Sequence, residues 1–171
     1  MRDIIRLLPV SDSQMTRKLD STDCRILKEL MADGSLTNVA LAGKVGLSAP
    51  PCLRRVRALE ETGVITGYTA LIDERALGFE LTAFAMVGLH NQSETDLRTF
   101  ENRILGWPIV REAYMLSGES DYILKCVTRD LTSFQDFILK DLTAVPNVAS
   151  VKTTLAIRRA KLAPGVPLAP E

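Results

Sequence analysis

The 171-residue sequence predicts an α+β fold in two parts, because the spacing of its apolar residues changes near residue 80. Before that point, apolar residues recur at helical spacing in three short segments, which are separated by residues 33–34 and 45–48. After it, four runs typical of β-strands alternate with two helical segments in the order β-α-β-β-α-β. The predicted fold is therefore an N-terminal three-helix domain joined to a C-terminal ferredoxin-like βαββαβ domain.

The first helix is expected to run from about 21 to 32, with Asp20 or Ser21 as its N-cap. Its apolar stripe is formed by Ile26, Leu27 and Leu30. The second helix is expected over residues 37–45. Its cap and core contacts are expected to come from Thr37 or Asn38, then Val39, Leu41 and Val45.

A third helix is expected after the short turn at residues 45–48. Gly46 allows the chain to reverse direction, and Ser48 can cap the next helix. Winding residues 52–61 at about 100° per residue gives the helix one apolar side, formed by Cys52, Val56 and Leu59 with Leu53 at its edge. Residues 62–63 are expected to end this helix.

The other side of the third helix is basic. Arg54 and Arg57 lie roughly opposite the apolar stripe, and Arg55 lies on its flank. Arginine contacts both phosphates and guanine edges, so such a helix fits the major groove of double-stranded DNA. A solvated surface helix is the alternative interpretation, but the glycine turn, the serine cap and the preceding short helix favour a DNA-binding (winged) helix-turn-helix. The predicted DNA contacts are Ser48, Ala49, Pro50, Arg54, Arg55 and Arg57.

Residues 64–72 are rich in β-forming side chains around a central glycine, which is typical of a small wing or a linking strand. Residues 73–80 are expected to form a linker. The strands of the second part are expected at 81–90, 109–116, 121–127 and 148–157, and its helices at 93–106 and 131–143.

The periodicity of the last two elements predicts which side chains share a side. The second helix of this part is expected to place on one face Leu131, Phe134, Ile138 and Leu142, and the last strand to align Val151, Thr153, Leu155 and Ile157. Four antiparallel strands with both helices on one face leave the other face bare. We therefore expect a dimer that packs sheet to sheet.

Composition excludes several classes of protein. Hydrophobic residues make up 46% and charged residues 25%, and the formal net charge is zero, so a DNA-binding function rests on local placement of charge. The chain has one histidine, His90, which leaves metal sites and Ser/His/Asp triads poorly supported, and no cofactor is expected. Three scattered cysteines predict buried thiols in a reducing compartment. No apolar run approaches a membrane span, so the cytoplasm is the expected location.

The N-terminal residues 1–18 are expected to be an extension. Met15 would make a natural start, so the first 14 residues are either upstream of the true start or a short flexible basic arm. The run at residues 1–10 lacks a small-residue cleavage site, which argues against a signal peptide.

From about residue 18 to residue 160, the sequence resembles the Lrp/AsnC (leucine-responsive regulatory protein, or feast/famine) family. In the first part, the matching residues are Leu19-Asp20, Asp23, Ile26-Leu27, Asp33-Gly34, Asn38, Leu41-Ala42, Val45-Gly46-Leu47-Ser48, Pro51-Cys52-Leu53, Arg55-Val56-Arg57, Leu59-Glu60, Gly63-Val64-Ile65, Gly67-Tyr68 and Ala70. In the second part, they are Ser117-Gly118, Asp121-Tyr122 and Leu124-Lys125, which match the family's glycine-aspartate turn.

The resemblance implies a transcriptional regulator whose C-terminal domain dimerises and binds a small effector, usually an amino acid. It also implies that dimers commonly assemble into octamers or other rings. It implies an effector site near the glycine-aspartate turn, at an interface between dimers. Carried over to this chain, the site comprises Ser117, Gly118 and Asp121, with Met115 and Leu131 as wall residues. On the residues alone, Gly118 could simply form a hairpin turn that Asp121 caps.

The chain departs from the best-known leucine-responsive regulators at two points. Glu119 and Ser120 replace an acidic and an aromatic residue in the turn, so leucine is not carried over as the effector. Ala49 and Pro50 differ from the usual start of the recognition helix, which affects the operator. The implied domains are an extension at 1–18, a helix-turn-helix domain at 19–72, a linker at 73–80, an effector-binding and oligomerisation domain at 81–160, and a tail at 161–171.

The sequence also bears on three other functions. Some haem-pathway decarboxylases resemble this family in fold, but His90 at a strand end is a poor catalyst, so no enzyme is expected. An RNA-binding sheet would display paired aromatics, whereas the central strands offer only Tyr114 and Tyr122. A nucleoid-type DNA organiser that needs no effector stays open as the alternative.

Overall fold

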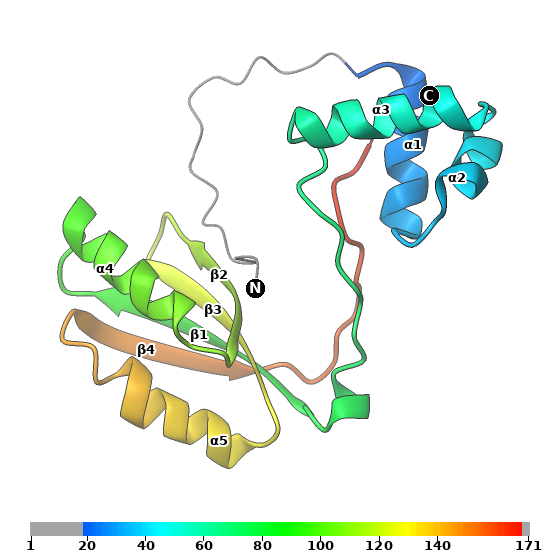
Figure 1. Cartoon of the computed structure of the whole chain (residues 1–171). Coiled ribbons are helices and arrows are strands. Elements are labelled where there is room, and N and C mark those ends of the chain that lie inside the picture. Colours follow the sequence, from blue (N-terminus) through cyan, green and yellow to red (C-terminus); the bar gives the residue numbers. More distant parts are fainter. Residues whose placement is uncertain (1–18, 169–171) are drawn as a thin grey trace. The chain divides into compact units, whose positions relative to one another are not determined.

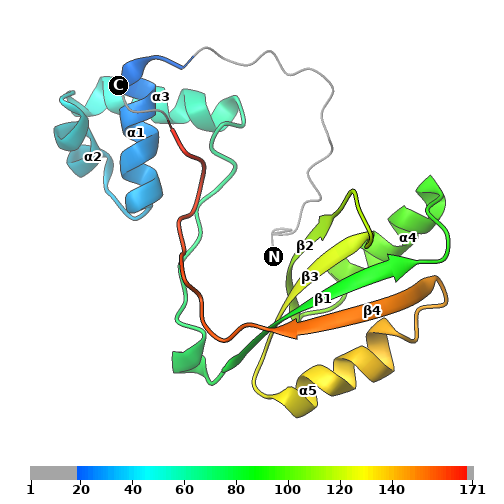
Figure 2. The same ribbon diagram turned by 180° about the vertical axis from the view of Figure 1, so that it is seen from behind.

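The computed structural model of this protein describes residues 19–168 (Figures 1 and 2). The predicted extension at 1–18, the choice between Met1 and Met15 as the start, and residues 169–171 of the predicted tail lie outside this range. The chain divides into two compact units. Among the described residues, one unit spans Ile72–Ala160, and the other holds residues 19–71 together with the segment that begins at Lys161.

The N-terminal unit contains three helices: α1 (Ser21–Ala32), α2 (Asn38–Val45) and α3 (Ala49–Glu61). These confirm the predicted positions. Asp20 caps α1 by accepting the backbone N–H of Asp23 at 2.8 Å. Gly46 ends α2 with φ +70°, a conformation that glycine adopts without strain. The three helices bury one apolar cluster, which contains Ile26, Leu41, Ala42, Val45, Cys52 and Leu59.

Two expectations for this unit are wrong. Val39 is 72% exposed and makes no core contact, because it lies about 200° around the helix from the buried Leu41. Residues 64–72 form no strand, because no described segment supplies the backbone partners that a strand needs. Instead, the N–H of Ile65 donates to the carbonyl of Leu59 at 3.0 Å, and the chain then continues through a 3₁₀ turn at Arg75–Leu77.

The second unit confirms the predicted βαββαβ order. Its elements are β1 (Leu81–Leu89), α4 (Glu94–Leu105), β2 (Val110–Met115), β3 (Tyr122–Thr128), α5 (Leu131–Asp136), which continues as a π-helical turn at Phe137–Leu142, and β4 (Val148–Leu155). The antiparallel sheet has the order β2-β3-β1-β4. Both helices lie on one face of the sheet, as Figures 1 and 2 show from opposite sides.

The sheet buries one face and leaves the other open. Facing the helices is a core that includes Ala83, Ala85, Val87, Phe100, Tyr122, Leu124, Cys126, Phe134 and Leu142. Strand alternation places on the opposite, open face Phe84, Met86, Tyr114, Ile123, Lys125 and Lys152.

Three side chains of this unit differ from expectation. Leu131 is 47% exposed at the first turn of α5, before the buried side of that helix begins, and Ile157 is 95% exposed because β4 ends at Leu155. Tyr122 lies in the core, where its hydroxyl donates to Glu101 at 3.1 Å. Tyr114 is therefore the one tyrosine of these two strands on the open face, so Tyr114 and Tyr122 do not form an aromatic pair there.

Candidate DNA-binding surface and effector site

The start of α3 leaves the Ser48 side chain free of a capping role. Ser48 occupies the N-cap position with φ −79° and ψ 158°, but its side chain makes no cap hydrogen bond. An N-cap side chain normally accepts from the N–H of the second or third helical residue. Here those residues are Pro50 and Pro51, which have no N–H.

The exposed side of α3 presents two arginines. Arg54 and Arg57 are exposed, and neither forms an ion pair with another described residue. The opposite side of the helix is held in the core by Cys52 and Leu59, both of which are 0% exposed. Two free guanidinium groups thus project from a helix that is anchored from behind, which is the arrangement that a groove-binding helix requires.

Arg55 has a different environment from its neighbours. Its Nη1 lies 2.7 Å from Asp20 Oδ2 and 2.9 Å from Asp23 Oδ1, so it joins α3 to α1. The pKa of Arg55 is raised by its hydrogen bonds to Asp20 and then Asp23. The pKa of Asp20 is lowered, first by the backbone N–H of Asp23 and then by Arg55. Arg55, which the sequence predicted to contact DNA, therefore pairs with two carboxylates of its own unit.

A shallow hollow of about 520 Å³ lies beside the turn between β2 and β3. Its lining includes three of the predicted effector residues, Met115, Ser117 and Gly118, and adds Met86, Leu116, Glu119, Ser120 and Lys152. A Cβ atom on Gly118 would meet no atom within 4 Å, so space is open above the turn. At the rim, Lys152 Nζ lies 3.5 Å from Glu119 Oε2.

Met86 and Lys152 were missed by the sequence analysis because they come from β1 and β4, far from the turn in the chain. The register of the sheet brings them together, since they are direct partners across the β1–β4 pair. Strand alternation in the sequence does not indicate which segment Met86 lies beside, because that depends on the register of the sheet.

Two predicted effector residues do not line this hollow. Asp121 Oδ2 accepts the backbone N–H of Leu89 at 2.6 Å, beside the irregular pairing at residues 88–89, so its carboxylate fixes the end of β1. Leu131 follows the far end of β3, about 20 Å along the strand from the turn. Within one chain, the structure thus separates Leu131 from the other four residues.

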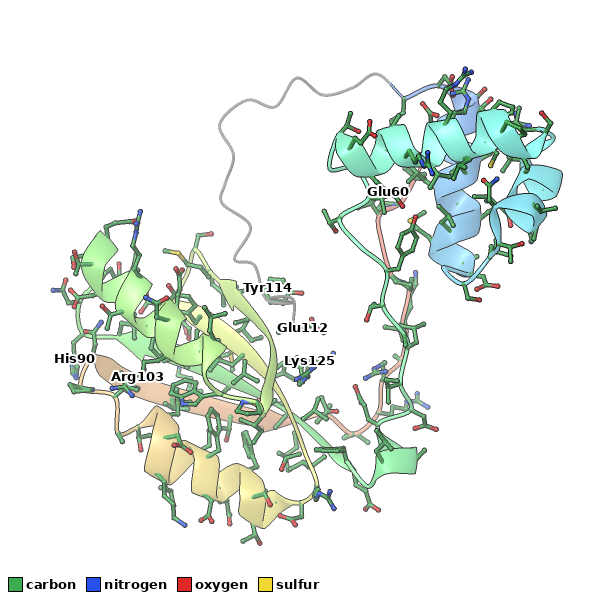
Figure 3. All side chains as sticks on the ribbon, in the orientation of Figure 1. Glu60, His90, Arg103, Glu112, Tyr114 and Lys125 are labelled. Carbon is green, nitrogen blue, oxygen red and sulfur yellow. The ribbon has the colours of Figure 1, made fainter. Side chains whose placement is uncertain are left out.

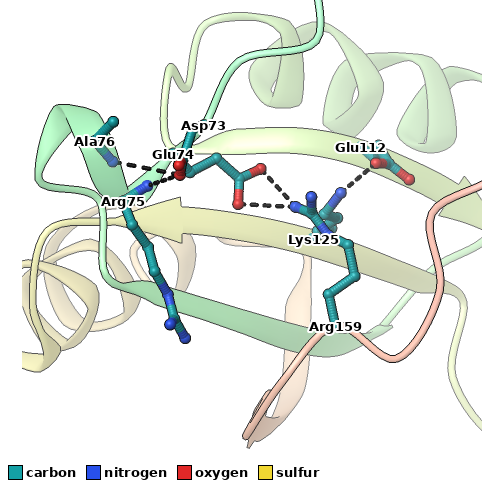
Figure 4. Close-up of polar contacts among 7 residues, drawn as sticks. All are labelled: Asp73, Glu74, Arg75, Ala76, Glu112, Lys125 and Arg159. Atoms are coloured by element: carbon teal, nitrogen blue, oxygen red, sulfur yellow. Dashed lines mark hydrogen bonds and ion pairs between the residues drawn. The ribbon is translucent and has the colours of Figure 1, made fainter.

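The open face also carries a cluster of polar side chains. Lys125 Nζ donates to Glu112 Oε1 at 2.5 Å, and the Tyr114 hydroxyl donates to Glu112 Oε2 at 2.9 Å (Figure 3). The hydrogen bond from Lys125 lowers the pKa of Glu112. Nearby, Arg159 Nη2 binds both carboxylate oxygens of Glu74 at 2.7 and 2.8 Å (Figure 4).

A three-helix unit with exposed arginines on its third helix, joined to a βαββαβ unit with a hollow at its turn, defines a DNA-binding transcriptional regulator with a ligand-binding domain. Residues 19–66 match the family model described as winged helix-turn-helix DNA-binding. Residues 82–166 match the model described as the Lrp/AsnC ligand binding domain. The chain belongs to the Lrp/AsnC family of transcriptional regulators.

Related proteins support this assignment. The chain is 58% identical over 144 residues to the leucine-responsive regulatory protein of Rhizobium meliloti (strain 1021), an alignment that covers 84% of this chain and 92% of the relative. It is 41% identical to the Bkd operon transcriptional regulator of Pseudomonas aeruginosa, covering 88% and 99%. A transcriptional regulator of Neisseria meningitidis, solved as an L-Met complex, superposes with a TM-score of 0.83 at 33% identity, covering 87% and 96%.

These relatives are regulators, so the chain is a transcriptional regulator and not an enzyme. Within residues 19–168, no group of three or more His, Cys, Asp or Glu side chains is placed to hold a metal ion. In the same range, no helix combines the length and apolar character needed to cross a bilayer.

Proposed function

We propose that this protein is a sequence-specific regulator that reads double-stranded DNA with α3. The observation that carries the proposal is the contrast between exposed Arg54 and Arg57 and the buried opposite side of the same helix. In this proposal, the start of α3 faces the same DNA groove as the two arginines, with the residues Ser48, Ala49 and Pro50. Arg55 supports the surface from behind through its ion pairs with α1.

We further propose that the hollow beside the β2–β3 turn binds a small effector, and that an amino acid is the best fit. A zwitterion needs partners for two opposite charges and an apolar wall for its side chain. Lys152 and Glu119 offer the charges, Ser117 and Gly118 the polar turn, and Met115 the wall. Support comes from the Neisseria relative, which was solved with L-Met. Asp121 shapes the turn by accepting the Leu89 N–H, and its negative charge acts on the effector from beside the hollow.

The proposed assembly is a dimer formed through the open sheet face, with larger rings such as octamers built from dimers. Phe84, Met86 and Ile123 give this face an apolar centre. In such an assembly, Leu131 would reach an effector site from another copy, since it cannot do so within its own chain. A regulator of this kind acts where the DNA lies, so we place it in the cytoplasm.

Selection of duplexes from a random-sequence pool tests the DNA-binding proposal. A regulator enriches one motif, and each mismatched base pair weakens binding by about 1–3 kcal/mol. An effector-independent organiser enriches no motif and binds all duplexes with the same steep salt dependence. Enrichment of a motif therefore supports the proposal, and uniform binding favours the organiser.

A thermal-shift screen of the twenty amino acids tests the effector proposal. A ligand at about 100 times its dissociation constant stabilises the folded state by about 2.7 kcal/mol, which raises the melting temperature by several degrees. Sizing chromatography in the same buffers shows whether the ligand changes the assembly. If no amino acid at millimolar concentration raises the melting temperature, the proposal of an amino-acid effector is wrong.

A further inference from the structure

We propose that the C-terminal segment, residues 161–168, is a structural part of the DNA-binding unit and docks on α1. The chain would then connect the two units twice, once through the linker after α3 and once through this returning segment. The sequence composition of this segment predicted only a tail. The proposal concerns the packing of the chain and goes beyond the functions proposed for α3 and the hollow.

The first observation is the grouping of the chain. The segment that begins at Lys161 belongs to the same compact unit as α1, α2 and α3, and not to the sheet that immediately precedes it. In both views, the chain after β4 runs back to the three helices (Figures 1 and 2). Leu168 is half-buried, whereas the residues from Lys161 to Pro167 are exposed.

The second observation is a close contact between Gly165 and Met31. Gly165 adopts φ +83°, and a Cβ atom there would collide with the Met31 sulfur and lie 2.9 Å from its Cγ. Met31 is half-buried in the last turn of α1. The backbone conformation therefore favours glycine at this position, and a larger residue would also force the Met31 side chain to move, which indicates a close contact between the segment and α1.

The start of the segment is fixed as well. Arg159 pairs with Glu74 through both carboxylate oxygens, so the chain leaves β4 bound to the beginning of the linker (Figure 4). The segment thus follows one fixed point, the Arg159–Glu74 pair, and contains a second, the contact of Gly165 with Met31. About ten residues of chain thus join β4 to the contact on α1. β4 carries Lys152 at the hollow, and α1 carries Asp23, which pairs with Arg55.

Hydrogen exchange of α1 tests the docking without DNA or effector, so its result is independent of the proposed function. The full chain is compared with a chain that ends at Ala160 and with Gly165→Leu. Val166→Ala is the matched control, because Val166 is the next residue and is 65% exposed. We expect the amides of α1 to exchange about tenfold faster in the first two variants and at the wild-type rate in Val166→Ala.

Sizing chromatography of the same proteins completes the test. If the amides of α1 exchange equally in the full chain and in the chain ending at Ala160, the segment does not dock on α1 and the proposal is wrong. A changed assembly size with unchanged exchange in α1 would also overturn it, because the segment would then belong to an interface between copies. Faster exchange confined to α1 and its contacts, with unchanged exchange in the β1 core, supports it.

Discussion

Arg55 on α3 lies 2.9 Å from Asp23 on α1, and the Asp23 side chain is only 2% exposed. A buried carboxylate is costly unless a charge or hydrogen bonds compensate it. Arg55 supplies that charge and also reaches Asp20, which caps the same helix. The pair therefore helps the buried apolar cluster to hold α3 against α1, while the neighbouring Arg54 and Arg57 stay exposed.

Replacing Arg55 with alanine is expected to destabilise the N-terminal unit. The change removes the ion pair of Arg55 with the buried Asp23, and the loss is about 2 kcal/mol, reduced from the fully buried case because Arg55 itself is 32% exposed. Arg54→Ala is the control and should stay within about 0.5 kcal/mol of wild type. Chemical denaturation measures both, and equal stability of the two variants would contradict a structural role for Arg55.

Ser48→Ala is expected to leave stability nearly unchanged, although Ser48 is an N-cap residue. Its hydroxyl has no N–H to accept because Pro50 and Pro51 follow. Thr37→Ala is the matched variant, because the Thr37 hydroxyl accepts the N–H of Ala40 at 3.2 Å, and its loss should cost about 1 kcal/mol. Thermal melting of both proteins checks the contrast. A loss at Ser48 as large as that at Thr37 would show that the Ser48 side chain stabilises the fold.

The structural role of Asp121 can be distinguished from its proposed role in effector binding. Asp121→Ala removes the acceptor of the Leu89 N–H and is expected to destabilise the sheet unit by about 1–2 kcal/mol. Asp121→Asn keeps an oxygen acceptor and the stability but removes the charge, so it should weaken the effector response selectively. Melting temperature and ligand-induced thermal shift are measured together. An Asn variant with a full ligand response would limit Asp121 to its structural role.

The Glu112–Lys125 pair predicts a pH dependence of stability. The hydrogen bond from Lys125 holds the pKa of Glu112 below its ordinary value of 4.5. The unfolded chain then binds more protons than the folded chain, so the stabilisation is complete above pH 4.5 and is lost as the pH falls through the folded pKa. Unfolding midpoints of wild type and Glu112→Gln should therefore differ at pH 7 and converge at acidic pH. A difference that persists unchanged at acidic pH would contradict this assignment.

The helix boundaries and the buried stripe of α3 could be predicted from the sequence, since apolar spacing and capping residues are local signals. Cys52 and Leu59 are buried as the helical wheel predicts. The wheel also placed Arg55 on the flank of the helix. It could not identify what that flank contacts, because Asp20 and Asp23 lie 35 and 32 residues earlier in the chain and only the packing of α3 against α1 brings them close.

The proposed effector site was predictable only where it is continuous in the chain. The turn residues Ser117 and Gly118 line the hollow, and they could be predicted together because they are consecutive in the chain. Lys152 joins them through the register of β4 on β1, which depends on how the whole sheet assembles. Residues 64–72 have strand composition but form no strand, since their backbone groups find no partner among the described residues.

Binding of α3 to a selected duplex is the measurement that tests the central claim most directly. Fluorescence anisotropy at one salt concentration compares wild type with Arg54→Ala, Arg57→Ala and Arg98→Ala, the last being an exposed helical arginine of the other unit with the same change in charge. The account predicts binding about tenfold weaker for the first two variants, with melting temperatures unchanged, and wild-type affinity for Arg98→Ala. Wild-type affinity in both Arg54→Ala and Arg57→Ala would contradict it.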